Sequence, residues 1–199
     1  IQIVDLQYLP DSVRYIGQSD IPYHSSTHSI SQSGPYLYLN GCNPGLTQGT
    51  AVVDLSNPEV PVLRGQWNDI YVHDLRIIND TIWACHIFDG KVSVIDALNK
   101  DSLKFVRSWV NNPLPNSPHN IAFTNNRNYA FVTNEIGTAL APGNLKIWDV
   151  SDLEDITLVN IYNPYLFVSS VAHNVEIYNN YAFVAYYSAG LKVLNISNP

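Results

Sequence analysis

The chain is built from short runs in which apolar and polar residues alternate. The clearest lie at its end, where residues 181–199 read YAFVAYYSAGLKVLNISNP. A period of two residues is typical of β-strands with one buried face, and the Val, Ile and Tyr content of the runs favours strands as well. Gly, Pro and Asn separate the runs and mark turns. No stretch shows a convincing helical period, so the pattern predicts an all-β protein.

The last stretch, residues 173–199, is one copy of a unit that recurs along the chain. A histidine opens each copy, at His28, His73, His119 and His173, with spacings of 45, 46 and 54 residues. Four short strands per unit of about 45 residues predict the antiparallel blades of a β-propeller, because such sheets bury both faces only against neighbouring blades. The third strands end in an acid or an amide, namely Asp5, Asp54, Asp96, Asp149 and Asn195.

Four histidine-initiated units leave residues 1–17 over, and these form a strand pair that completes a preceding or closing blade. We therefore expect residues 1–199 to form a single β-propeller domain or an excerpt of one, with about four blades of a larger ring. The chain starts at Ile1, inside a strand, which favours an excerpt from a longer protein. An open propeller of this kind would expose two unpaired blade faces.

Composition narrows the classes of function. An apolar content of 46% supports a substantial core, and a net charge of −7 disfavours binding to nucleic acid or to an anionic membrane. No apolar run approaches the roughly 20 residues that span a bilayer, so we expect no direct membrane insertion. Cys42 and Cys85 occupy similar places in adjacent units, which makes a disulfide conceivable. Two thiols are not a disulfide framework, however, and we expect both to be unpaired.

The segments GLKVLNISNP, GTAVVDLSNP and GNLKIWDVSD resemble LVIVD repeats, and the blade starts YVHD, PHN and AHN resemble those of the choice-of-anchor B family of extracellular bacterial proteins. The resemblance covers essentially the whole chain. It implies a secreted or surface-attached propeller, held by one of several interchangeable C-terminal anchors, with no assigned catalytic activity. Ser29 departs from the pattern, because Asp or Asn follows the histidine in the other units.

Blade geometry places the four histidines at one mouth of the central channel, provided that the first strand of each blade is innermost. The start of strand one, the end of strand two and the start of strand three share one edge of an antiparallel sheet. The ends of the second strands therefore add polar residues to the same mouth. These neighbours are Gly41, His86, Asn134, Glu135 and Tyr186, with Asp89 in a following loop.

Two interpretations of the histidines stay open. Neutral imidazoles and carboxylates are ligands for zinc, copper or nickel, which predicts a divalent metal site formed by His73, His86, His119 and His173. Alternatively, each histidine donates a ring hydrogen bond to a backbone carbonyl of the adjacent blade and locks the joint between blades. A rotational ring tends to hold equivalent side chains apart, so we expect only pairs to meet, such as His73 with His86 or His119 with Glu135.

Several other residues receive simpler expectations. Trp67 lies in the segment GQWNDIYVHD, which we interpret as a loop that reaches the histidine mouth and stacks on a sugar or a peptide side chain. His24 is expected to be a solvated loop residue. Trp83 and Trp148 should pack between blades, and the acids that end the third strands should cap the turns that follow them.

The sequence contains no G-x-S-x-G elbow, phosphate loop, C-x-x-C pair or H-E-x-x-H motif, so nothing in it points to an enzyme. We expect a non-enzymatic extracellular or cell-surface module that binds a protein or glycan, or that assembles with other copies or with the rest of a longer chain. The alternative is a metal-binding site at the channel mouth, with or without catalysis. The candidate ligand-binding residues are His28, His73, His119, His173, His86, Glu135 and Trp67.

Overall fold

The computed structural model describes residues 1–22, 25–42, 49–138, 142–164 and 170–199. Within these ranges regular structure is confined to strands and one 3₁₀ turn, η1 (Tyr187–Ala189). No helix in the described residues is long and apolar enough to cross a membrane. The predicted all-β class is therefore confirmed.

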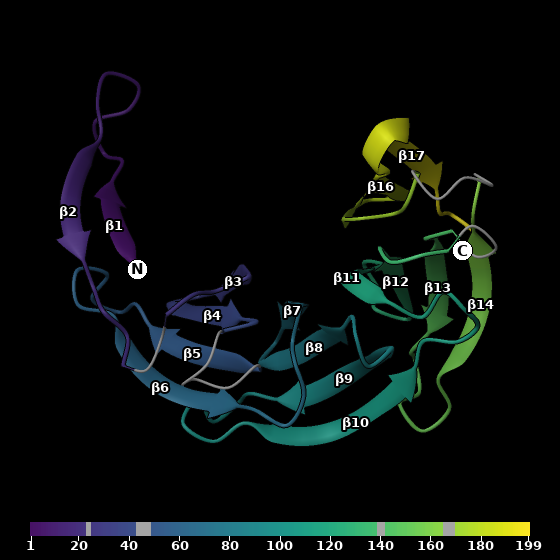
Figure 1. The fold of residues 1–199 in the computed structure, drawn as a ribbon, viewed down its shortest axis with the longest axis horizontal. Coiled ribbons are helices and arrows are strands. Elements are labelled where there is room, and N and C mark those ends of the chain that lie inside the picture. The colour runs from purple at the N-terminus through teal and green to yellow at the C-terminus, as the bar shows by residue number, and fades with distance from the viewer. Residues whose placement is uncertain (23–24, 43–48, 139–141, 165–169) are drawn as a thin grey trace.

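Three complete four-stranded antiparallel sheets form the centre of the molecule, and in each the strands follow chain order from one edge to the other. A three-stranded sheet follows them and a two-stranded sheet precedes them (Figure 1). The strands are β1 (Gln2–Asp5) and β2 (Arg14–Gln18); β3 (Ser29–Ser33), β4 (Tyr36–Asn40), β5 (Thr50–Asp54) and β6 (Val62–Trp67); β7 (Asp74–Ile78), β8 (Thr81–His86), β9 (Lys91–Asp96) and β10 (Lys104–Val110); β11 (Pro118–Phe123), β12 (Tyr129–Asn134), β13 (Leu145–Asp149) and β14 (Thr157–Tyr162); and β15 (Val175–Tyr178), β16 (Tyr181–Ala185) and β17 (Leu191–Asn195).

The sheets stand side by side as blades in an arc, and the first strand of each blade is innermost (Figure 1). Strands β3, β7, β11 and β15 contact one another in succession, whereas β6, β10 and β14 lie along the outer side. This arrangement confirms four-stranded propeller blades. It also meets the condition on which the placement of the histidines depends.

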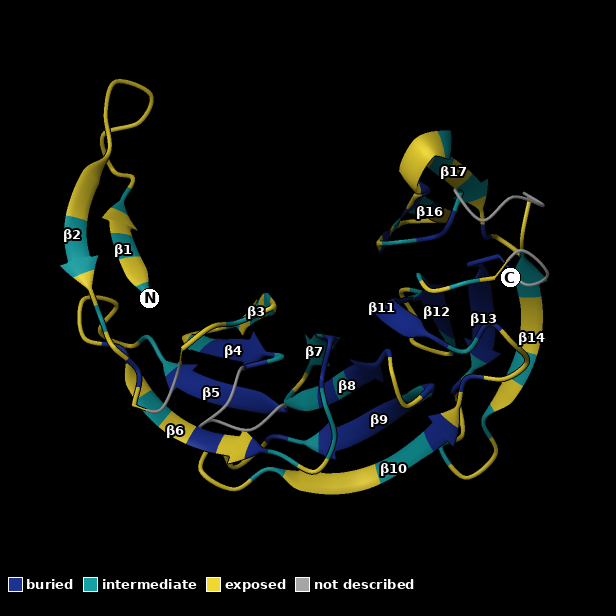
Figure 2. Ribbon diagram, viewed as in Figure 1, coloured by how far each residue is buried: buried dark blue, intermediate teal, exposed yellow. Residues whose placement is uncertain are grey.

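Apolar side chains from neighbouring blades pack together and form the core. One cluster joins Tyr38 of β4 to Ile82 of β8, and the next joins Val92 of β9 to Val132 of β12. Trp83 and Trp148 both belong to this second cluster, which confirms their predicted packing between blades. The middle strands are accordingly the most deeply buried ones (Figure 2).

The turn that follows the C-terminal end of each third strand is stabilised in the same way in every sheet. The side-chain oxygen of the last residue accepts a hydrogen bond from the backbone N–H two residues later, at 2.8–3.0 Å. Hydrogen bonds from Ser151 accordingly hold the pKa of the Asp149 carboxyl below its usual value. The predicted turn-capping role is therefore confirmed for the four acids Asp5, Asp54, Asp96 and Asp149, and Asn195 caps its turn in the same way.

The two terminal sheets expose apolar side chains, as expected for an open propeller. Val4 and Tyr15 are exposed in the first sheet, and Tyr181 and Val193 are exposed in the last (Figure 2). At the positions of Val4 and Val193, the central blades hold buried side chains such as Val53 and Val94. Cys42 and Cys85 are both buried and unpaired, which confirms the expectation that they form no disulfide.

A buried lysine that the sequence did not reveal ties β13 to the loop before β11. Lys146 is fully buried, and its Nζ donates hydrogen bonds to the carbonyl oxygens of Asn111, Pro113 and Pro115, the last at 2.6 Å. Burial lowers the pKa of this ammonium group to about 8, so it is mainly charged at neutral pH. Three carbonyl dipoles thus take the place of a carboxylate partner.

We expect Lys146→Met to lower the free energy of unfolding by about 2–4 kcal/mol, because three inward-facing carbonyls lose their donor. Lys192→Met is the matched control. Lys192 occupies the same position in β17 and is only partly buried, so the loss there should stay within about 1 kcal/mol. Urea denaturation measures both. Equal losses in the two variants would contradict the assigned role of Lys146.

Candidate functional site

The four repeat histidines occupy equivalent places at the inner end of their blades. Each stands at or just before the start of the innermost strand, and the backbone N–H of His28, His73 and His173 bonds to a carbonyl of the second strand at 2.8–2.9 Å. In β11 the pairing with β12 shifts register between Pro118 and Ile121, around His119. A bulge of this kind re-aims the side chain that it carries.

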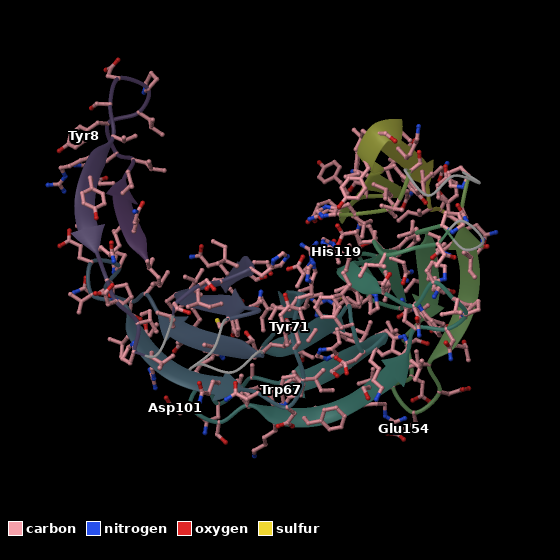
Figure 3. The ribbon with its side chains drawn as sticks, in the orientation of Figure 1. Tyr8, Trp67, Tyr71, Asp101, His119 and Glu154 are labelled. Carbon is pink, nitrogen blue, oxygen red and sulfur yellow. The ribbon has the colours of Figure 1, made fainter. Side chains whose placement is uncertain are left out.

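The imidazole rings form a continuous row across the four blades. Ring centroids lie 4.0 Å apart for His28 and His73, 4.6 Å for His73 and His119, and 4.0 Å for His119 and His173. The expectation that a ring holds equivalent side chains apart was wrong. Because the first strands are innermost, side chains of adjacent blades converge there. His119 accordingly lies on the inner side of the arc, whereas Asp101 and Glu154 lie on its outer side (Figure 3).

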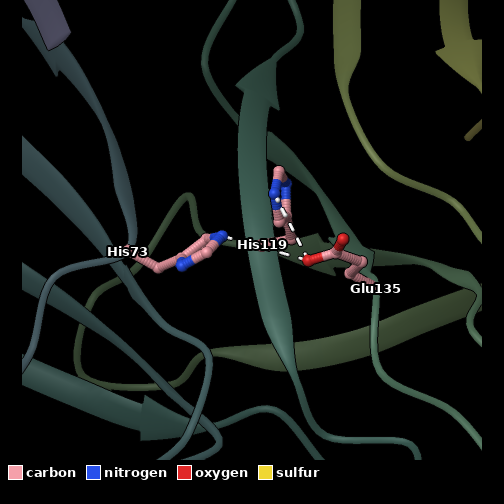
Figure 4. Close-up of side chains that lie close together, drawn as sticks. All are labelled: His73, His119 and Glu135. Atoms are coloured by element: carbon pink, nitrogen blue, oxygen red, sulfur yellow. Dashed lines mark ion pairs between the residues drawn. The ribbon is translucent and has the colours of Figure 1, made fainter. Parts of the chain in front are cut away.

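Glu135, which directly follows β12, places its carboxylate among three of these rings. Its Oε2 lies 3.6 Å from Nε2 of His119 and 3.9 Å from Nε2 of His73, and its Oε1 lies 3.6 Å from Nε2 of His173 (Figure 4 shows the first two). The pairing of His119 with Glu135 is therefore as expected from the sequence. The third partner, His173, makes the carboxylate the centre of the cluster.

The backbone at Glu135 is held by the loop before β11. The N–H of Glu135 bonds to the carbonyl of Ser117 at 3.3 Å, and the Ser117 hydroxyl exchanges hydrogen bonds with the backbone of Ile136 at 2.7 and 2.9 Å. Behind it, the buried Asn134 accepts bonds from the Ser117 N–H and the Asn111 amide. The loop before β11 thus fixes the backbone that carries the Glu135 carboxylate.

Two tyrosines complete the cluster, and neither was predicted from the sequence. The Tyr71 hydroxyl lies 3.4 Å from Nδ1 of His73, and the Tyr187 hydroxyl donates a hydrogen bond to Oε1 of Glu135. Tyr71 stands two residues before the repeat histidine His73, and this proximity in the sequence could have indicated that it lies near the cluster. Gly41 makes room for it, since a Cβ there would come within 2.9 Å of the Tyr71 hydroxyl and 2.8 Å of the His28 Cβ.

Burial keeps the inner imidazoles neutral. It lowers the pKa of His73 to about 4, helped by the neighbouring histidines, and it lowers the pKa of His119. For Glu135, burial alone would raise the pKa, but the Tyr187 hydroxyl and the three imidazoles outweigh it and the net direction is downward. Nε2 of His73 and Nδ1 of His119 are buried without a hydrogen-bond partner among the described residues. The cluster therefore holds the neutral imidazoles of His73 and His119 beside an ionised carboxylate.

The joints between blades are locked by the residue after each histidine. Asp74 accepts hydrogen bonds from the Ser29 hydroxyl at 3.2 Å and from the Asn120 amide at 2.7 Å, and Asn120 accepts one from the Val175 N–H at 3.0 Å. These bonds join β3, β7, β11 and β15 in one chain. Among the described residues, neighbours of the histidines thus link the blades, and a hydrogen bond to the His173 backbone of the adjacent blade also acts on the His119 ring, so that ring shares the linking role.

His86 and Trp67 are placed differently from the sequence expectation. His86 is fully buried, with Nδ1 donating to the Tyr71 carbonyl at 2.7 Å and Nε2 accepting from the Ser93 hydroxyl at 2.8 Å, so neither nitrogen is left for a metal or for His73. Trp67 ends β6 instead of lying in a loop, because that strand runs two residues further than expected. It is 5% exposed within the core and cannot stack on a ligand.

Tyr186 and Asp89, which were also predicted at the channel mouth, lie outside the histidine cluster. Tyr186 is fully buried and donates its hydroxyl to the carbonyl of Tyr162 at 3.3 Å, so it points away from the mouth. Asp89 lies in the turn between β8 and β9 and lines a surface groove. His24 lies outside the described residues.

That groove lies on the same face as the histidines and has a volume of about 370 Å³. It runs between the β8–β9 turn, the loop before β11 and the segment after β12. Three of its apolar side chains are strongly exposed, Phe88 at 73%, Leu114 at 70% and Ile136 at 50%. Ile136 adjoins Glu135, and the Phe88 ring lies 5.3 Å from that of Tyr71, so the groove continues into the histidine cluster.

Several solved structures have similar folds, and one of them is described as a β-propeller domain. The structure superimposes on the β-propeller domain of Cps50 (Swd1) from Myceliophteria thermophila with a TM-score of 0.67 at 11% identity, covering 98% of this chain and 64% of that one. A functionally unknown protein from Desulfotomaculum acetoxidans gives 0.58 at 17% identity, covering 91% and 54%. The computationally designed Ika4 protein gives 0.59 at 14%, covering 91% and 99%.

These similarities and the four-stranded blades define the class: the protein is a β-propeller. More particularly, residues 25–69 and 170–199 match the model of the LVIVD repeat. No curated protein sequence matches the chain significantly. The chain spans about half to two thirds of the two natural structures named above.

The burial of His86 makes the stability of the protein depend on pH. Burial lowers the pKa of His86 below the ordinary 6.5, so between these two values the native state binds fewer protons than the unfolded chain. The free energy of unfolding should therefore fall as pH drops through about 6.5. In urea denaturation, His86→Gln should lose less stability between pH 7 and pH 5 than the wild type. Imidazole ¹⁵N spectra at pH 7 should show the proton on Nδ1, and a proton on Nε2 would contradict the assignment.

Proposed function

We propose that this propeller is a non-catalytic binding module of the bacterial cell surface or extracellular space, and that it holds a segment of a partner protein on its histidine face. The observation that carries the proposal is the apolar groove. Phe88 and Leu114 stand in turns with most of their surface in water, beside a hollow large enough for a few side chains.

The chemistry of the groove favours a peptide over a glycan. Its large exposed side chains are two aliphatic ones and one phenyl ring; the lining also includes the exposed Asp89 and Thr138, and Glu135 directly precedes Ile136. An apolar segment flanked by Lys or Arg complements this combination, and the net charge of −7 acts in the same direction. The partner that fits is therefore a protein segment with apolar anchors and basic neighbours.

The proposed location rests on the resemblance of the blade starts YVHD, PHN and AHN to the choice-of-anchor B family. The exposed apolar faces of the two terminal sheets support assembly with further blades, supplied by other copies or by a longer chain. Both statements are part of the proposal and are separate from the groove.

The groove is tested by selecting peptides from a random display library on the wild-type protein. We expect selected peptides to carry apolar side chains next to Lys or Arg. Their affinity should fall at least roughly tenfold for Phe88→Ser/Leu114→Ser, because apolar anchors of this size are worth about 1–2 kcal/mol each.

Leu98→Ser is the matched control. Leu98 is 74% exposed, like Phe88, but it stands at the opposite end of β9, in the turn to β10. Peptide affinity should be unchanged in this variant. Failure to select peptides, or equal affinity for wild type and groove variant, would contradict the proposal. Binding on a glycan array that the groove variant abolishes would replace the peptide by a glycan.

A further inference from the structure

The cluster at the channel mouth has a property that the peptide groove does not explain. Three imidazole Nε2 atoms surround one carboxylate in a partly enclosed space, with the His73 and His119 side chains 9% and 6% exposed and that of Glu135 24% exposed. Nε2 of His73 is buried without a hydrogen-bond partner among the described residues, and a polar atom in that state lowers the stability of the fold. A bound cation that accepts the lone pair of this nitrogen would remove that cost.

We infer that His73, His119, His173 and Glu135 form a binding site for a zinc-type divalent metal ion. Donor atoms of His73, His119 and Glu135 lie within 4.8 Å of one another, and the carboxylate oxygens lie 3.6–3.9 Å from the three Nε2 atoms. Two ligands that are each about 2.1 Å from a tetrahedral ion lie roughly 3.4 Å apart. The carboxylate–imidazole distances therefore exceed this value by about 0.2–0.5 Å, and donor atoms as far as 4.8 Å apart would approach by up to about 1.4 Å around a shared ion.

The donor set selects the kind of ion. Imidazole nitrogens with one carboxylate suit Zn²⁺, Ni²⁺ and Cu²⁺, whereas Ca²⁺ and Mg²⁺ require oxygen ligands. Three imidazoles and one carboxylate oxygen complete a tetrahedral shell, and closed shells of this kind stabilise structure. The site would thus pin together three adjacent blades, since its ligands come from the inner ends of β7, β11, β12 and β15.

The surroundings are those of a metal site as well. Nε2 of His73 is the buried nitrogen without a hydrogen-bond partner, and it faces Glu135. On the other side of that ring, Nδ1 faces the Tyr71 hydroxyl at 3.4 Å, and the Tyr187 hydroxyl bonds to the Glu135 carboxylate. Outer hydrogen bonds of this type orient metal-binding histidines and carboxylates. The His173 side chain is 35% exposed, which leaves a path for the ion from the channel.

The structure also supplies an internal control. His28 belongs to the same repeat position and stacks on His73 at 4.0 Å, but it is exposed, and among the described residues it makes no ion pair with Glu135. The proposal therefore assigns three of the four repeat histidines to the ion and leaves His28 outside. A purely structural repeat would treat all four alike.

The experiment is calorimetric titration of the tag-free, chelator-treated protein with ZnCl₂, and separately with CaCl₂. We expect one equivalent of Zn²⁺ per chain and no saturable Ca²⁺ binding. Glu135→Gln and His119→Gln should each weaken Zn²⁺ binding at least tenfold, whereas His28→Gln should change it less than twofold. Co²⁺ added to the wild type should give the visible spectrum of a tetrahedral ion with nitrogen and oxygen ligands.

Absence of saturable Zn²⁺ binding by the wild type would overturn the proposal. Equal affinity in Glu135→Gln, or a loss in His28→Gln as large as that in His119→Gln, would overturn it as well. The Co²⁺ spectrum uses only the wild type, so an octahedral spectrum would count against the site even if a variant failed to fold. None of these outcomes depends on peptide binding, so the metal site and the proposed function fail or stand separately.

Discussion

Each blade of this protein has two apolar faces, and each face leaves water only by packing against a neighbouring blade. The rest of the structure depends on that constraint. Because of it, the central blades pack against one another through apolar clusters, such as the one that contains Val92 and Val132. It also brings the innermost strands β3, β7, β11 and β15 into contact, and polar side chains at the ends of these strands then meet.

The consequences are most visible at the inner end of the blades. The residue after each histidine turns toward the neighbouring blade, where the carboxylate of Asp74 and the amide of Asn120 link the inner strands. The histidine itself contacts the histidine of the adjacent blade, so that the four rings form a row along the inner strands. In the pairs His73-Asp74 and His119-Asn120, the second residue thus links the blades and the first contributes an imidazole to the row.

Residues that break the repeat give the histidine row its chemistry. Glu135 has no carboxylate counterpart at the ends of the other second strands, where Gly41, Ile87 and Tyr186 stand. Tyr187 bonds to that carboxylate, and the loop anchored by Lys146 leads to Ser117, which holds its backbone. The exposed groove of Phe88, Leu114 and Ile136 borders the same point. Departures from the repeat therefore gather on one face, around the third complete blade.

The sequence by itself determined the architecture, because strand periodicity and the histidine spacing are local features repeated along the chain. It also identified the turn caps, whose partners lie two residues away, and it named His119 and Glu135 as a pair. Tertiary structure alone decided which groups meet. It moved His86 into the core with both nitrogens bonded, extended β6 so that Trp67 is buried, and brought His173 to Glu135. The physical reason is that the packing of strands and blades sets the distances between residues that are far apart in the chain, such as His173 and Glu135, and no local pattern records these distances.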